Sequence, residues 1–158
     1  MSQRVDQRDP TRIELDCYNK ILKLNDHVMS VCKPKDKNVN NHHIPKKNTS
    51  IGKILMDSCV ECGADILEAN EGYYVGKNLD PITRLKNYYE RINLQKHAIR
   101  LTFRMEHIIR VLHFDKPFAE STIKYMMDLL CELRAGLVAW RDSETNMSKQ
   151  LAKEYYDK

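Results

Sequence analysis

The stretch from Pro81 to His113 constrains the fold most, because its apolar residues recur at the spacings of one long helix. They form two stripes that lie nearly opposite each other. A surface helix needs only one apolar face, so two stripes predict burial on both sides, by the chain's own bundle and by a neighbouring subunit. The first stripe comprises Leu94, Ala98, Leu101, Met105, Ile108 and Leu112, and the second comprises Leu85, Tyr88, Ile92, Ile99 and Phe103.

A basic edge follows the same predicted helix. Lys96, Arg100, Arg104 and His107 stand at i, i+4, i+8 and i+11, so successive side chains are about 6 Å apart along the axis. Ile82–Phe114 holds seven Lys or Arg against two acidic residues. Arginine can bind a phosphate through two donors, so the edge is a candidate nucleic-acid site whose binding would depend on salt. A solvated helix face remains the alternative interpretation.

The rest of the chain predicts three more helices. Glycine and proline are scarce, with five each in 158 residues, which favours long helices over a many-stranded sheet. Asp9-Pro10, Thr49 or Ser50, and Asp80-Pro81 are good N-terminal signals. We therefore expect an all-α, up-down-up-down four-helix bundle over residues 10–143. A flexible arm is expected over 1–9, and a polar tail or short extra helix over 144–158. The individual helices are predicted at 10–32, 51–70, 81–113 and 120–142.

The cellular setting follows from what the chain contains. No apolar run approaches the roughly 20 residues that span a bilayer, so no membrane partner is expected. Met1–Pro10 is polar and charged, unlike a signal peptide. Five cysteines is an odd number, and most fall on apolar helix faces. These features predict a cytoplasmic protein with free thiols.

Three groups of residues invite a site with metal or redox chemistry. Cys59 and Cys62 form a CxxC motif, but both lie on a predicted core stripe, without a second CxxC or a His pair at zinc-finger spacing. A row of acidic residues shares one exposed face of one helix, whereas a di-metal bundle site takes inward ligands from several helices. His42 and His43 lie in a basic loop, where solvation or phosphate contact is expected. The acidic row named above comprises Asp57, Glu61, Asp65 and Glu68.

Enzymatic chemistry has no motif to support it. The chain has no glycine-rich phosphate loop, nucleophile elbow or Ser-His-Asp arrangement. We therefore expect no catalytic residue, metal or cofactor. The segment Lys33–Lys53 holds six lysines against one aspartate, and Lys46 and Lys47 in it are expected to extend the nucleic-acid site.

Several short motifs in this order resemble the Avd-like four-helix bundle family. This family includes the accessory variability determinant of diversity-generating retroelements and the proteins encoded in 23S rRNA intervening sequences. The similarity covers roughly residues 15–143. The motifs are Ile44-Pro45-Lys46-Lys47, Ile51-Gly52, Glu68-Ala69-Asn70, Ile99-Arg100-Leu101-Thr102-Phe103-Arg104, and Leu137-Val138-Ala139-Trp140-Arg141-Asp142-Ser143.

The resemblance implies a non-enzymatic, pentameric accessory protein with a basic surface. Such a protein binds a reverse transcriptase and RNA or cDNA and supports mutagenic cDNA synthesis. Arg100 and Arg104 fall in the family's basic third helix, and Trp140 falls at its closing tryptophan, where packing is expected. The second apolar stripe would form the contact between subunits. The alternative is a protein-interaction bundle of the intervening-sequence type that binds no nucleic acid.

Overall fold

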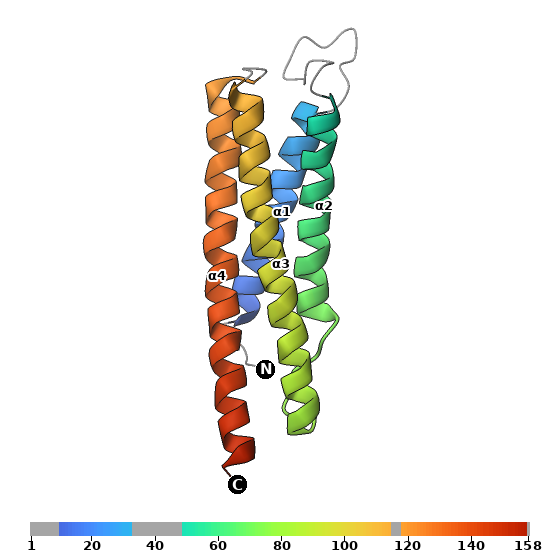
Figure 1. Cartoon of the computed structure of the whole chain (residues 1–158), viewed down its shortest axis with the longest axis vertical. Coiled ribbons are helices and arrows are strands. Elements are labelled where there is room, and N and C mark those ends of the chain that lie inside the picture. Colours follow the sequence, from blue (N-terminus) through green and yellow to red (C-terminus); the bar gives the residue numbers. More distant parts are fainter. Residues whose placement is uncertain (1–9, 33–48, 115–117, 158) are drawn as a thin grey trace.

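Four helices form a closed bundle (Figure 1). The computed structural model describes residues 10–32, 49–114 and 118–157. The helices are α1 (Pro10–Cys32), α2 (Thr49–Glu71), α3 (Pro81–Phe114) and α4 (Glu120–Tyr156), and the described ranges contain no strand. Each helix packs against its neighbours in the chain, and α1 also packs against α4. The predicted four-helix bundle is therefore confirmed.

The helix ends follow the local signals in the sequence. The carboxylate of Asp80 accepts hydrogen bonds from the Thr83 backbone N–H at 3.0 Å and from the Thr83 hydroxyl at 2.7 Å, which caps α3 as predicted. Gly72 follows the end of α2 and donates its N–H to the carbonyl of Glu68 at 2.7 Å. A Cβ at Gly72 would lie only 2.7 Å from that carbonyl oxygen, so glycine fits where a side chain would not.

The fourth helix is longer than predicted. We expected it to end near Asp142 and to leave a polar tail, but α4 continues without a break to Tyr156. Its buried face continues from Leu137 and Trp140 to Glu144, Ser148 and Leu151. These positions keep the helical spacing of three and four residues. Glu144 and Ser148 are polar, so an apolar pattern could not reveal that this face stays buried.

The main core lies between all four helices and includes the first stripe of α3. Ala98, Met105 and Leu112 are fully buried, and Leu101 and Ile108 are nearly so. Leu94 is half-buried and packs against the same cluster. The first stripe thus packs inside the bundle as predicted. Burying a large apolar side chain contributes roughly 1.5–3 kcal/mol, so this seam anchors α3 to the other helices.

The second stripe of α3, which we predicted to contact another subunit, is largely covered by the chain itself. The chain itself buries most of it: Leu85, Ile92 and Ile99 are each 7% exposed. At the free ends of α3 and α4, a small core forms from Leu85, Tyr88, Ile92 and Leu151, with Val75, Met147 and Ala152 packed on it. The last turns of α4, where we expected a polar tail or a short extra helix, therefore cover Leu85, Tyr88 and Ile92, whereas Ile99 packs in the main core.

Candidate nucleic-acid interface

The predicted basic edge lies on the outward face of α3. Lys96, Arg100, Arg104 and His107 are all exposed, and none of them forms an ion pair with another described residue. Other cations on the bundle differ in this respect. Arg110 bonds to Glu106 at 3.0 Å, and Arg134 bonds to the same glutamate at 2.7 Å. The side chains of the four edge residues are thus left open to solvent.

Exposed aromatic rings interleave with these cations, a feature of the nucleic-acid site that was not predicted. Tyr89 is 57% exposed, Phe103 55% and Phe114 87%. Positions 89, 96, 103 and 110 repeat every seven residues, and so do 93, 100, 107 and 114, so both rows follow one side of the helix. This spacing was the signal that could have revealed the face. We call this side, from Tyr89 to Phe114, the basic-aromatic face.

Phe103 differs from the other members of the second stripe. It is the one that is exposed in the chain, so its contact with another subunit stays a prediction. The guanidinium of Arg134, from α4, lies 3.8 Å from the centre of the Phe103 ring. Thr102 and Glu106 hold this arginine through hydrogen bonds of 2.9 and 2.7 Å from Nε and Nη2. The guanidinium of Arg134 is therefore held in place against the exposed ring of Phe103.

One of the seven Lys and Arg residues of Ile82–Phe114 is buried and lies apart from the basic edge. Arg91 is 4% exposed and donates to Glu144 from Nε at 2.8 Å and to Glu14 from Nη2 at 2.6 Å. Glu144 also accepts from Gln95 Nε2 at 2.8 Å and from the Trp140 indole at 2.9 Å. This cluster ties α1, α3 and α4 together. Trp140 is fully buried, so its role is packing and hydrogen bonding, as expected.

The buried cluster holds more negative than positive charge when both glutamates are ionised. Burial is the largest influence on Glu14 and raises the pKa of its carboxyl from 4.5 to about 7, although Arg91 acts in the opposite direction. Glu144 adds to the rise because it is a second carboxylate on the same guanidinium. The cluster is structural, and its charged groups are buried and not part of the exposed basic-aromatic face.

The acidic row on α2 is only partly a solvated face. Asp57, Glu61 and Glu68 are exposed, but Asp65 is buried and its carboxylate bonds to His97 Nδ1 on α3. Burial raises the pKa of Asp65 despite the opposing effect of His97. Within the described ranges, no three His, Cys, Asp or Glu side chains are arranged to hold a metal ion.

The CxxC thiols lie in the core as predicted. Cys59 and Cys62 are fully buried, and burial raises the pKa of both, that of Cys59 to about 12. A thiol of such high pKa is a weak nucleophile near neutral pH. Of the described cysteines, Cys131 is the exposed one. The thiols of Cys59 and Cys62 thus behave as small apolar core residues.

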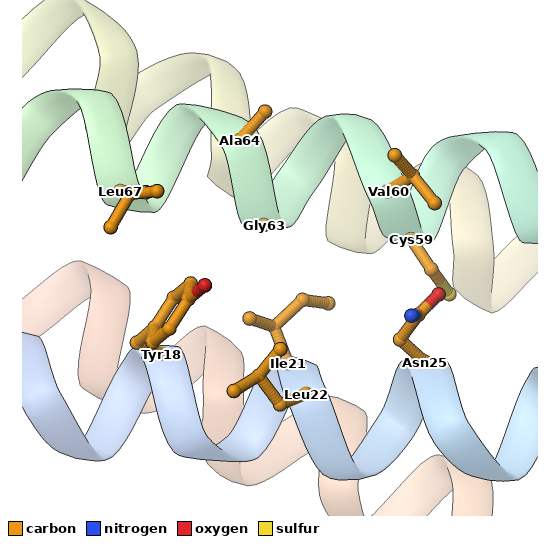
Figure 2. A pocket seen from close by; sticks show the side chains of 9 residues that line it. All are labelled: Tyr18, Ile21, Leu22, Asn25, Cys59, Val60, Gly63, Ala64 and Leu67. Carbon is orange, nitrogen blue, oxygen red and sulfur yellow. The ribbon is translucent and has the colours of Figure 1, made fainter.

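A second surface of different chemistry lies between α1 and α2. A groove of about 200 Å³ lies there, lined by Tyr18, Leu22 and Leu67. Figure 2 shows Gly63 on α2 facing Ile21 on α1. The two helices expose large apolar side chains, some of which also line this groove. They are Leu15 (56%), Leu22 (46%), Met29 (37%), Ile54 (50%), Val60 (59%) and Leu67 (38%). Such apolar exposure is typical of a protein-binding surface.

Some predicted site residues lie outside the described residues. Lys46, Lys47, His42 and His43 are among them, so the structure does not place the predicted extension of the basic edge. Among the helices of the described ranges, none has the length and apolar character that a membrane span requires. No protein-family model, curated protein or solved structure gives a significant match to this chain.

Proposed function

We propose that this protein is a non-enzymatic, cytoplasmic accessory protein that binds RNA or cDNA along the basic-aromatic face of α3. The observation that carries the proposal is the coincidence, on one helix face, of exposed cations without carboxylate partners and exposed aromatic rings. Cations bind the phosphate backbone, and rings stack on unpaired bases of any sequence.

The resemblance to the Avd-like family adds the biological setting to this proposal. By that resemblance the protein serves a diversity-generating retroelement, binds its reverse transcriptase and supports mutagenic cDNA synthesis. The nucleic-acid contact is the part that the geometry of α3 supports. The reverse transcriptase partner follows from the resemblance alone.

Charge reversal on α3 tests the nucleic-acid proposal. Arg100→Glu with Arg104→Glu is expected to abolish retention of a single-stranded RNA at 100 mM salt, as measured by gel shift. Both side chains are exposed, so the circular dichroism spectrum and the melting temperature are expected to remain as in the wild type.

A matched control variant separates this face from net charge. Lys23→Glu with Lys77→Glu makes the same change of charge at exposed positions of α1 and of the loop before α3. We expect this control to retain RNA. If the α3 variant retains RNA as well as the control does, the basic-aromatic face is not the binding site.

A second candidate function is a protein-interaction bundle of the intervening-sequence type, which the apolar surface of α1 and α2 favours. Most of the second stripe of α3 is buried within the chain. We therefore expect a contact between copies at Leu22 and Val60, which are exposed. The pentamer implied by the resemblance would use this surface. The two candidate functions differ in whether the oligomer binds RNA in a salt-dependent manner.

Light scattering tests the assembly. The wild type is expected to be an oligomer at micromolar concentration, and Leu22→Glu with Val60→Glu is expected to yield monomers that keep the helical spectrum. A wild type that is monomeric at this concentration would contradict the assembly. Oligomers without salt-dependent RNA binding would favour the interaction bundle over the accessory protein.

A further inference from the structure

A cavity of about 270 Å³ lies between α3 and the last turns of α4, next to the basic edge. From α3 it is lined by Tyr89, Asn93 and Lys96, and from α4 by Lys149. Its volume is just below the roughly 300–1,000 Å³ of pockets for drug-sized ligands. The space therefore suits a group of the size of one nucleotide.

The lining of this cavity combines the groups that recognise a nucleotide. Tyr89 offers an exposed ring for stacking on a base, and the ammonium groups of Lys96 and Lys149 can bind a phosphate. The amide of Asn93 has no hydrogen-bond partner among the described residues and can pair with a base edge. Ile92 and Ala152 supply an apolar contact surface.

Charge distinguishes this cavity from its neighbour. Its lining residues include Lys96 and Lys149 and no carboxylate, and neither lysine is ion-paired with a described residue. A second cavity nearby, of about 280 Å³, is lined by Lys77 and Arg84 but also by the carboxylate of Glu154. That arginine is already engaged, because its Nε donates to a backbone carbonyl at 3.2 Å. The first cavity is thus the better anion site.

The cavity is continuous with the basic-aromatic face. Lys96 belongs to both, and Arg100 and Arg104 follow it at intervals of one turn, about 6 Å each. A strand that leaves the cavity past Lys96 would meet these two arginines in turn. A duplex would not fit this arrangement, because its bases are paired and cannot be seated individually.

We propose that this cavity seats one unpaired nucleobase of a bound single strand, with its ring on Tyr89 and its phosphate between Lys96 and Lys149. The inference rests on the proposed function and makes it specific, because it names a single strand and the point where one base is held. It also gives the unpredicted extension of α4 a part in binding. Without residues 145–152, the α4 wall of this cavity would be absent.

The test uses Tyr89→Leu, with Tyr89→Phe as the matched control that retains an aromatic ring. Two fluorescently labelled strands serve as probes, an oligouridine 12-mer and a 12-mer of the same backbone with abasic sites. Loss of one stacked base is expected to weaken oligouridine binding by about 5- to 150-fold for Tyr89→Leu. Tyr89→Phe is expected to bind as the wild type does, and the abasic strand is expected to bind both variants equally.

Lys149→Gln provides a second variant that removes one cation from α4. It is expected to bind both strands more weakly and to lower the salt dependence by the contribution of about one phosphate. It also keeps the inference testable if Tyr89→Leu lowers the helical content.

Each failure points to a different claim. If Tyr89→Leu binds oligouridine as tightly as the wild type does, the cavity seats no base of a bound strand, while loss of binding on reversal of Arg100 and Arg104 would still support the proposed function. If the wild type binds neither strand, the proposed function itself fails. Uridine monophosphate is the remaining probe. If Tyr89→Leu weakens binding of the free nucleotide but not of the strand, the cavity is a mononucleotide site, which overturns the inference.

Discussion

The buried carboxyl of Glu14 predicts that the protein loses stability as the pH rises from acid to neutral. Its pKa is about 7 in the folded protein, against an ordinary value of 4.5. Between these two values the unfolded chain releases the proton while the folded chain keeps it. Stability is therefore complete below pH 4.5 and declines until the pH passes about 7. The difference of about 2.5 pKa units corresponds to about 3 kcal/mol.

Glu14→Gln isolates this effect from other groups that titrate in the same range. Glutamine resembles the protonated carboxyl in shape, and its carbonyl oxygen can still accept from Arg91. Urea unfolding followed by circular dichroism at pH 5, 6, 7 and 8 gives the free energy of unfolding. From pH 5 to pH 8 the wild type is expected to lose about 2.5 kcal/mol more than Glu14→Gln does, because part of the loss lies below pH 5.

An exposed acid on the same helix supplies the control. Asp16→Asn is expected to leave the pH dependence of the wild type unchanged, because Asp16 is exposed. The reasoning is refuted if the wild type and Glu14→Gln lose stability in parallel over this range. A larger loss for Glu14→Gln would reverse the sign and refute it as well.

Three further predictions concern packing. Deleting residues 147–158 removes the cover of the small core around Tyr88, so increased binding of a hydrophobic dye and a lower melting temperature are expected, whereas an unchanged protein would contradict the role given to α4. In the native protein, one of the five thiols, that of Cys131, is expected to react rapidly with a thiol reagent; rapid reaction of several would contradict the buried core. Gly136→Ala places a Cβ 2.9 Å from the Cys17 sulfur, so a loss of about 1–3 kcal/mol in urea unfolding is expected. Cys17→Ala should relieve that loss, and additive effects of the two changes would contradict the contact.

The sequence predicted the helix number and most helix ends, because these depend on local signals. Asp80-Pro81 opens α3, and α1 spans 10–32 as expected. The end of α4 was not predictable in the same way. Its buried face includes Glu144, whose carboxylate is satisfied by Arg91, Gln95 and the Trp140 indole. Such a network is formed by residues far apart in the chain, so a local pattern reads them as polar surface.

The candidate site was predictable in part for a related reason. Helical spacing placed Lys96, Arg100 and Arg104 on one exposed edge, and the structure agrees. Spacing alone could not tell an apolar stripe buried by the same chain from one buried by another, since both have the same period. Helical spacing also could not identify Lys149 as a site residue. It lies in the last turns of α4, where we expected a polar tail or a short extra helix.

The salt dependence of single-strand binding tests the central claim most directly. Fluorescence anisotropy of a labelled oligouridine, measured from 50 to 200 mM salt, gives the slope of log K against log salt concentration. Each phosphate contact contributes about −0.7 to this slope for a single strand. We predict that Arg100→Gln with Arg104→Gln makes the slope shallower by about 1.4, the contribution of two contacts. An unchanged slope in this variant, or no binding by the wild type at 50 mM salt, would contradict the account.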